Sequence, residues 1–440
     1  MHTSRKVRIA AIAVAGSLAT ASFAITPAAA QLQEPEIPGP TTTSAAPFTT
    51  PDTSDCPARQ TPPPPTDTSE EPRAGESAPE PLPVPDQPVG GPGLGYCGLA
   101  HADDAPDAPS EISAESWLIA DLDTGEVLAA KDPHGRHRPA STIKTLLALV
   151  AFGEIDLGRT IVGTQEDANI EGSRAGIGPG GVYTNEILMQ ALVLSSGNDA
   201  ANAIAQQLGG VDETIRKMNE YAAELGALDT RTATPSGLDG PGMSSSAYDL
   251  AVIFRAAMQI PEFAAYLQLD QIDFPGYPAD PELPGDVDRP GFAMGNDNVV
   301  NWMYPDSIGG KNGYTNAARH TYVGAAERDG RRLVVSVLKA ENEPHPVWKQ
   351  IADLFDYGFR VPEGASIGTL DAIASIMEAQ SRDESPALSP PVSAADDGLT
   401  SPPSPSSPET GQRVLIGAGG AALIALMLYV AIRAGRRRNR

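Results

Sequence analysis

The sequence predicts an α+β fold in which helices flank an antiparallel sheet. Strand-like segments occupy both ends of residues 111–362, helical periodicity fills the middle, and tight turns join neighbouring strands. The length of this region suits one domain with a single hydrophobic core. The Pro-rich segments on either side contain too few apolar residues to form a core, so we expect them to be disordered spacers.

The expected domain opens with a hairpin. Residues 116–120 and 126–130 are strand-like, and Asp123-Thr124-Gly125 forms a turn between them. Helical patterns follow over residues 142–154, 184–194, 199–208, 211–225 and 246–258. Two further strands, 321–327 and 331–338, flank Asp329-Gly330, which is a strong hairpin signal. An amphipathic helix over residues 347–359 closes the domain.

The N-terminal residues predict export. Residues 1–30 have the pattern of a signal peptide: basic residues, an apolar stretch over 9–24, and a cleavage site at Ala28-Ala29-Ala30. Residues 31–110 are the first expected spacer, rich in Pro, Thr and Ser. Cys56 and Cys97, the only two cysteines of the chain, lie in this spacer. An even pair of cysteines in an exported protein indicates a structural disulfide.

The C-terminal residues predict a membrane anchor. Residues 363–412 are a tail and a second spacer, and residues 413–433 form an apolar segment long enough to cross a bilayer. The basic residues 434–440 should stay in the cytoplasm by the positive-inside rule. We therefore expect a single-pass protein of the cell membrane with residues 111–362 outside the cell.

A short motif before this segment suggests a second form of anchoring. Ser407-Pro408-Glu409-Thr410-Gly411 resembles the sortase signal Leu-Pro-x-Thr-Gly, with Ser407 in place of leucine. Simple membrane anchoring is the first expectation, and transfer to the cell wall at Thr410, with sortase as partner, is the alternative. The formal net charge of -25 argues against nucleic acid as a partner.

Ser141 and Lys144 stand at the start of the predicted helix 142–154, and their spacing places them on one face. A serine hydroxyl is a poor nucleophile and needs an adjacent base. A lysine buried among apolar residues such as 146–150 can be neutral near pH 7. The pair therefore predicts a nucleophile with its base, although a helix cap and a solvated lysine would give the same pattern.

Two further motifs follow Ser141 and Lys144 along the chain. Ser196-Gly197-Asn198 and Lys311-Asn312-Gly313 follow at domain-scale spacing, and each alone would also suit a turn. In this order the three motifs resemble the signature of penicillin-binding proteins and serine β-lactamases. Residues 178–184, 234–239 and 244–251 further resemble stretches of the low-molecular-mass D-alanyl-D-alanine carboxypeptidases. The resemblance covers nearly all of residues 112–359.

The resemblance implies a β-lactamase/transpeptidase-like fold and a serine peptidase that removes the terminal D-alanine from peptidoglycan stem peptides. Ser141 would attack the peptide carbonyl, Lys144 would take its proton, and Ser196 would relay a proton to the leaving amine. The implied substrate-binding residues are Asn198, Lys311, Gly313, Tyr314 and Thr315. β-Lactams would be covalent inhibitors, and neither a cofactor nor a metal is expected.

Elementary chemistry agrees with these roles. A cationic Lys311 suits the terminal carboxylate of a substrate, and Gly313 lets a substrate backbone approach the strand. The backbone N–H groups of Ser141 and Tyr314 are the natural donors for an oxyanion. Lys144 and Lys311 should also lower each other's pKa, which helps Lys144 act as a base.

The sequence departs from the family pattern at two places. Asn312 stands where the family usually has threonine, which bears on carboxylate recognition and on β-lactam sensitivity. Many relatives also carry a β-rich domain after the catalytic one, and the stretch after Phe359 is too short for it.

Other classes of protein fit the sequence less well. A class A β-lactamase would have a Glu-x-x-Leu-Asn string between Asn198 and Lys311, which is missing, and an aspartate at the position of Gly197. A zinc site at His134 and His137 lacks a third ligand, so we expect these to be exposed loop histidines. No Gly-x-Ser-x-Gly nucleophile elbow occurs. The non-enzymatic alternative is a wall-binding scaffold with a degenerate catalytic domain.

Overall fold

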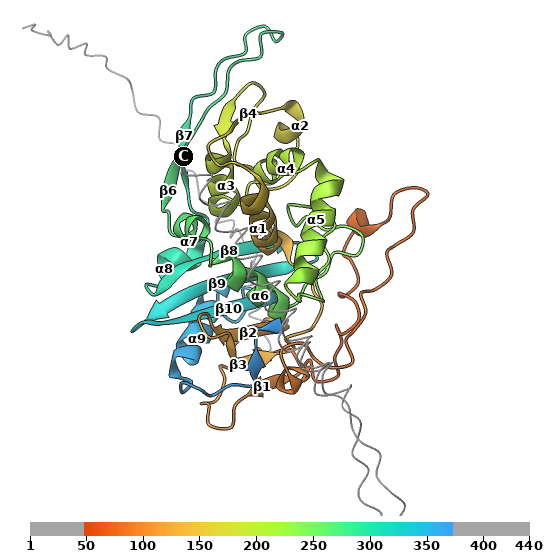
Figure 1. Ribbon diagram of the computed structural model, residues 1–440, viewed down its shortest axis with the longest axis vertical. Helices are drawn as coiled ribbons and strands as arrows, with labels where there is room; N and C mark the ends of the chain where they lie inside the picture. Colours follow the sequence, from red (N-terminus) through yellow and green to blue (C-terminus); the bar gives the residue numbers. More distant parts are fainter. Residues whose placement is uncertain (1–47, 373–440) are drawn as a thin grey trace, which may run out of the picture. The chain divides into compact units, whose positions relative to one another are not determined.

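The computed structural model describes residues 48–372, and the catalytic region folds around a seven-stranded sheet (Figure 1). The strand order is β1-β3-β2-β10-β9-β8, with β11 also paired to β3, and neighbouring strands are antiparallel. The strands of this sheet are β1 (Leu99–His101), β2 (Ser116–Asp121), β3 (Glu126–Lys131), β8 (Ser307–Thr315), β9 (Arg319–Arg328), β10 (Arg331–Ala340) and β11 (Gly368–Thr369). The expected antiparallel sheet is therefore confirmed.

Helices cover both faces of the sheet. Successive side chains of a strand point to opposite faces, so each strand contributes to two hydrophobic cores. Leu118 and Val334 pack into the larger core under α1 and α6, whereas Trp117 and Val335 pack into a second core under α9. The helices are α1 (Lys144–Glu154), α2 (Gln165–Ala168), α3 (Asn185–Leu194), α4 (Asn198–Gln207), α5 (Val211–Glu224), α6 (Ala247–Ala257), α7 (Pro261–Leu267), α8 (Val299–Met303) and α9 (Val347–Arg360). The six helices expected from periodicity are confirmed to within a few residues.

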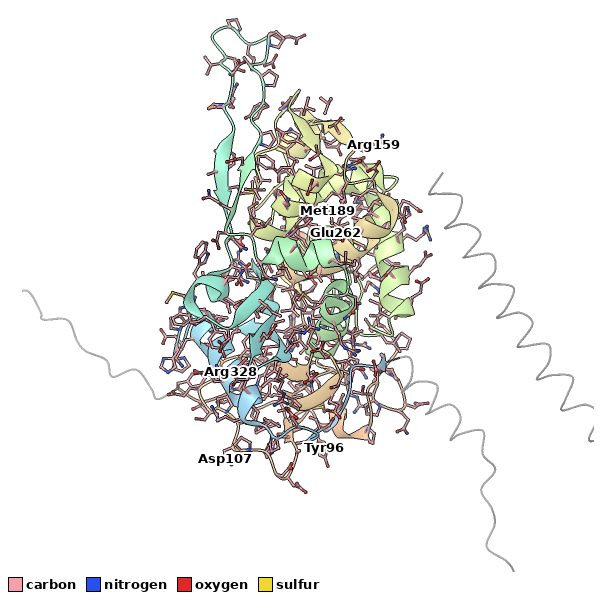
Figure 2. All side chains as sticks on the ribbon, turned by 60° about the vertical axis from the view of Figure 1, so that its left-hand side comes forward. Tyr96, Asp107, Arg159, Met189, Glu262 and Arg328 are labelled. Carbon is pink, nitrogen blue, oxygen red and sulfur yellow. A yellow bond between two sulfur atoms is a disulfide. The ribbon has the colours of Figure 1, made fainter. Side chains whose placement is uncertain are left out.

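One prominent element has no counterpart in the sequence analysis. Strands β6 (Gln271–Phe274) and β7 (Phe292–Gly295) form a separate hairpin that projects from the helical half of the domain (Figures 1 and 2). A further small sheet pairs β4 (Thr160–Val162) with β5 (Val182–Thr184). The strands of both small sheets are three or four residues long, and such short runs carry little periodicity.

The expectation of a disordered spacer was wrong for residues 48–110. This segment contains the short 3-10 helices η1 (Thr68–Glu70) and η2 (Pro92–Leu94), contributes β1 to the main sheet, and buries Val89 and Leu94 in the larger core. The expected disulfide between Cys56 and Cys97 is present. A Pro-rich segment cannot build its own core, but here it is ordered by the core and polar groups of the neighbouring domain.

The domain also extends beyond its expected end at residue 362. Strand β11 pairs with β3, and Leu370 and Ala372 are buried. The tail therefore packs on the domain as far as residue 372, the last described position.

The expected membrane features lie outside the described residues. These are the signal peptide at 1–30, the membrane segment at 413–433 and the sortase-like motif at 407–411. Over residues 48–372, no single helix meets the length and apolarity needed to cross a bilayer, and α6 and α7 meet it only as a pair bent by 111°.

Candidate active site

Ser141 lies in the short 3-10 helix η3 (Ala140–Ile143), and Lys144 is the first residue of α1, which continues directly from η3. Lys144 Nζ lies 2.8 Å from Ser141 Oγ. The helical spacing predicted from the sequence therefore brings the hydroxyl and the amine into direct contact. Lys144 is 1% exposed, so its amine is shielded from water.

Lys144 has two further partners. Its Nζ lies 2.7 Å from Asn198 Oδ1 and 2.6 Å from the carbonyl oxygen of Ser236. Burial lowers the pKa of Lys144 well below its usual value, and the nearby charge of Lys311 adds to this effect. A neutral amine donates two N–H bonds, to Asn198 and Ser236, and its lone pair then faces the Ser141 hydroxyl proton. This arrangement equips Lys144 to act as a general base.

The second motif forms the link between α3 and α4. Ser196 adopts a left-handed φ of 58°, and its Oγ is buried with no hydrogen-bond partner among residues 48–372. A buried hydroxyl without a partner is costly, and such strained positions concentrate at functional sites. Gly197 is required here, because a Cβ would lie 2.8 Å from Asp199 Oδ1 and 2.9 Å from Ala175 Cβ.

Asp199 is a structural residue that the sequence analysis missed. Its carboxylate accepts hydrogen bonds from the backbone N–H groups of Ala175, Gly176 and Ile177, at 2.7, 2.8 and 3.0 Å. Asn198, directly before it, donates through Nδ2 to the carbonyl oxygen of Glu171 at 2.7 Å. Together these bonds tie the loop over residues 171–177 to the start of α4 and fix the Asn198 amide so that its oxygen faces Lys144.

The third motif lies on the edge strand β8. Lys311 is 2% exposed, its Nζ lies 3.2 Å from the carbonyl oxygen of Asn312, and Asp297 Oδ1 is 4.0 Å away. Burial lowers the pKa of Lys311, and Asp297 acts in the opposite direction. Gly313 lets β8 pass close to the nucleophile, because a Cβ there would lie 2.7 Å from the Ser141 backbone nitrogen.

The motifs meet at a cleft of about 420 Å³. Ser141, Ser196, Asn312, Gly313 and Tyr314 line this cleft, whereas Lys144, Asn198 and Lys311 are buried behind its wall. Thr315 does not line the cleft: its Oγ1 accepts a hydrogen bond from the Ala318 N–H at 2.9 Å within the turn to β9. Further lining residues that the motifs did not indicate are Asp297, His320 and Trp348.

The expectation of exposed loop histidines was wrong for His134 and His137. His137 is 1% exposed, and burial lowers its pKa to about 3. His134 Nδ1 lies 2.8 Å from Asp229 Oδ2, and its Nε2 lies 3.0 Å from the carbonyl oxygen of Val89. Residues 132–138 are inside the molecule because residues 48–110 cover them, which periodicity could not reveal.

His134, Asp229 and Asp249 come together as a cluster that could offer ligand atoms to a metal. Their polar atoms are already engaged, because Arg136 Nε donates to Asp229 Oδ1 at 3.0 Å and Thr230 Oγ1 donates to Asp249 Oδ2 at 2.7 Å. A cationic guanidinium beside the carboxylate also disfavours a second cation. The cluster is therefore a structural hydrogen-bond network.

The fold and the site define a serine hydrolase of the penicillin-recognising type, with a lysine amine in contact with the serine hydroxyl one turn away. The chain belongs to the D-alanyl-D-alanine carboxypeptidase family, Peptidase_S11, whose model matches residues 102–342.

Similar proteins support this assignment. D-alanyl-D-alanine carboxypeptidase DacB2 of Mycobacterium tuberculosis is 48% identical over 270 residues, which cover 60% of this chain and 87% of DacB2. A solved D-alanyl-D-alanine carboxypeptidase from the same organism is 46% identical with a TM-score of 0.56, covering 61% of this chain and 99% of that one. The Streptomyces K15 DD-transpeptidase is 25% identical with a TM-score of 0.52, covering 58% of this chain and 99% of that one.

Other curated relatives are matched over a smaller share of their length. The chain covers 60% of the length of DacD from Escherichia coli, with 32% identity over 248 residues. The family model and the similarity to DacB2 favour the carboxypeptidase interpretation over a β-lactamase.

Proposed function

We infer that this protein is a serine-type D-alanyl-D-alanine carboxypeptidase that trims the terminal D-alanine from peptidoglycan stem peptides. The observation that carries this inference is the environment of the Lys144 amine, which contacts Ser141 Oγ and is held by Asn198 and Ser236. The family of the chain supplies the reaction, and the buried lysine explains how a serine hydroxyl can be activated.

The reaction divides into two acyl transfers. Lys144 takes the hydroxyl proton while Ser141 Oγ attacks the carbonyl carbon between the two D-alanines. The resulting oxyanion would accept hydrogen bonds from the backbone N–H groups of Ser141 and Tyr314. The C–N bond then breaks, the leaving amine receives a proton through Ser196 Oγ, and an ester links the shortened peptide to Ser141. Water hydrolyses this ester, with Lys144 again acting as the base.

The buried cation of Lys311 is suited to the free carboxylate that distinguishes a terminal dipeptide from the middle of a chain. A charge-assisted hydrogen bond from a desolvated ammonium group is stronger than one at the surface. Asn312 offers an amide next to it, in the place where the family usually has threonine. Thr315 would reach a substrate only after giving up its present role in the turn to β9.

The partners and the location follow as parts of the same proposal. The substrates are stem peptides of peptidoglycan, and β-lactams form a stable ester with Ser141 because they resemble the terminal dipeptide. Residues 1–30 would direct export and residues 413–433 would anchor the protein in the cell membrane, with sortase transfer at Thr410 as the alternative.

Two measurements test the proposed function. Fluorescent penicillin should label the wild-type protein covalently and should not label Ser141→Ala. Mass spectrometry of stem pentapeptides after incubation should show loss of one alanine, whereas splitting of cross-linked dimers would indicate an endopeptidase. Equal labelling of both proteins would refute the role of Ser141, and a folded wild type that neither labels nor trims would favour the wall-binding scaffold.

A further inference from the structure

Residues 48–110, here called the N-terminal strap, lie almost entirely before the region that matches the family model, which begins at residue 102. In Figure 1 the strap runs beside α5 and continues towards β1 and β3. Figure 2 places its residues Tyr96 and Asp107 at the end of the domain opposite the β6–β7 hairpin. None of the catalytic or substrate-binding residues lies in the strap.

The strap is bound to the segment that leads to the nucleophile. Arg136, five residues before Ser141, is 1% exposed. Its Nη1 donates to the carbonyl oxygens of Gln60 and Leu82 at 2.9 and 2.5 Å, and its Nη2 donates to that of Pro83 at 2.8 Å. The Arg136 backbone N–H also donates to the Ala58 carbonyl oxygen at 2.8 Å. Extended Pro-rich chain leaves its carbonyls without internal partners, and a buried guanidinium satisfies several of them at once.

Arg138 forms the contact with the strap that lies nearest to Ser141 in the sequence. Its guanidinium pairs with both carboxylate oxygens of Glu70, which ends the short helix η1 of the strap. The two side chains are 2% and 14% exposed. A two-point pair of this kind fixes the orientation of both planes as well as their distance. Removing one partner from a buried pair leaves the other charge uncompensated.

The backbone between Arg138 and Ser141 is strained. Ala140 has a φ of 48°, a left-handed value that is unfavourable for a residue with a Cβ. The turn is crowded, because a Cβ on Gly237 would lie 2.0 Å from the Ala140 carbonyl oxygen. On the sheet side, Thr321 Oγ1 donates to the Pro139 carbonyl oxygen at 2.8 Å. Such a conformation persists only when its surroundings hold it from several sides.

We propose that Glu70 of the N-terminal strap is a positioning residue for the catalytic serine, acting through Arg138. Helix α1 and Thr321 fix the turn on its downstream and sheet sides, and the Glu70–Arg138 pair fixes it upstream. The strap is then part of the catalytic unit, although the residues that perform the chemistry all lie after it. This inference rests on the proposed function, because Ser141 is taken as the nucleophile.

The test compares Glu70→Gln and Glu70→Ala with the wild type in the full-length protein. We expect both variants to lower the rate constant of acylation by penicillin at saturation, Glu70→Ala by about 10- to 100-fold, since a misplacement of ~1 Å can cost about 10²-fold. The concentration of penicillin that gives half-saturation should change little, because the walls of the cleft remain. Glu70→Gln keeps the shape and one acceptor, so its loss should be smaller.

Glu71→Gln is the matched control, since Glu71 is the next residue and is exposed. It should acylate at the wild-type rate. A second readout is hydrogen–deuterium exchange of the peptide that spans residues 136–143, which should become faster in Glu70→Gln and stay unchanged in Glu71→Gln. A role in stability alone would lower the melting temperature while leaving the acylation rate constant intact below it.

The acylation rate constants of the Glu70 variants decide whether Glu70 positions the serine. Wild-type acylation by folded Glu70→Ala would overturn the proposal, and if that variant does not fold, wild-type acylation by Glu70→Gln would overturn it. A fall in affinity at an unchanged acylation rate constant would also contradict it. An inactive wild type would instead refute the proposed function, and the two failures are therefore distinguishable.

Discussion

The amide oxygen of Asn198 lies 2.7 Å from the Lys144 amine. Asp199, the next residue, points its carboxylate at the backbone of residues 175–177 instead. Lys144 is therefore held by a neutral acceptor, while the Asp199 carboxylate accepts hydrogen bonds from backbone N–H groups of another loop. The charges of Asp297 and Asp199 still raise the pKa of Lys144, but burial and the charge of Lys311 outweigh them, and a carboxylate in direct contact with the amine would favour its protonated form far more.

Asn198→Asp tests this division of roles. A carboxylate beside Lys144 should raise the pKa of the lysine, so that the amine is protonated at neutral pH. The acidic limb of the pH profile for acylation should then move to higher pH, by about one to three units, and activity should recover in alkaline buffer. Gln206→Glu, the same chemical change on the exposed face of α4, should leave the profile unchanged. An unshifted profile for Asn198→Asp would contradict the role of Lys144 as base.

Lys144→Ala and Lys144→Arg should abolish burst-phase acylation while the protein remains folded. Loss of a general base costs about 10²- to 10⁴-fold, and arginine cannot replace it because the guanidinium stays protonated. Stopped-flow measurement of acyl-enzyme formation, together with circular dichroism, checks both parts. A normal burst in either variant would require a different base.

Gly313→Ala should slow acylation by about 10- to 100-fold. The added Cβ would meet the Ser141 nitrogen at 2.7 Å and Thr321 Oγ1 at 2.5 Å, so the strand or the nucleophile turn must move. Gly295→Ala is the matched control, because a Cβ there has nothing within 4 Å. Equal acylation rates for the two variants would contradict the role of Gly313 in letting β8 pass close to Ser141.

The stability contributed by His134 and Asp249 should decrease as the pH rises from about 6 to about 9, while the lowered pKa values of Lys131 and Lys144 act in the opposite direction. Burial favours neutral His134, but the hydrogen bond to Asp229 and the charges of Asp229 and Asp249 together outweigh burial, so the pKa of His134 in the folded protein is raised above 6.5. A raised histidine pKa stabilises the fold below pH 6.5, and this contribution is lost as the pH passes the folded value. Asp249 has the same sign, since burial, followed by the charge of Asp229, raises its pKa to about 8.

Urea unfolding across this pH range measures the effect. His134→Gln should make the profile less steep, because the contribution of the histidine is lost, while Asp249, which also faces this position with Asp229 and the Val89 carbonyl, still titrates. A profile that stays as steep in this variant would assign the pH dependence to other groups, with Asp132 the next candidate, since burial raises its pKa to about 7.

Removing the disulfide by Cys56→Ser with Cys97→Ser should lower the free energy of unfolding by about 2–4 kcal/mol. The bridge closes a loop between residues 41 positions apart, and the reduced chain loses that constraint in its unfolded state. Urea unfolding of the double variant beside the wild type gives the difference. An unchanged midpoint would mean that the strap is held by its polar contacts alone.

The parts of this fold that sequence could predict are those in which neighbouring residues carry the information. The helix at Val211–Glu224 shows in periodicity, the β9–β10 hairpin in its Asp-Gly turn, and the Ser141–Lys144 contact in a spacing of three residues. In each case the partner lies within a few positions of the residue that predicts it.

The parts that escaped prediction depend on partners far along the chain. Glu70 pairs with Arg138 across 68 positions, and Asp199 meets backbone groups more than 20 positions earlier. Pro-rich composition correctly indicates that the strap has no core of its own, but composition contains no information about a neighbouring surface that can order it. The burial of His134 and His137 was missed for the same reason.

The two ends of the described chain meet the sheet at one place. β1 pairs with residues 129–131 of β3, and β11 pairs with residues 126–127 of the same strand. Strands at an open edge can capture foreign chains, and covering an edge with short segments is a common protection. Within residues 48–372, the other edge of the main sheet is the long strand β8. The nine-residue edge strand β8 therefore runs directly beside Ser141, whereas the opposite edge presents only the three residues of β1 and the two residues of β11.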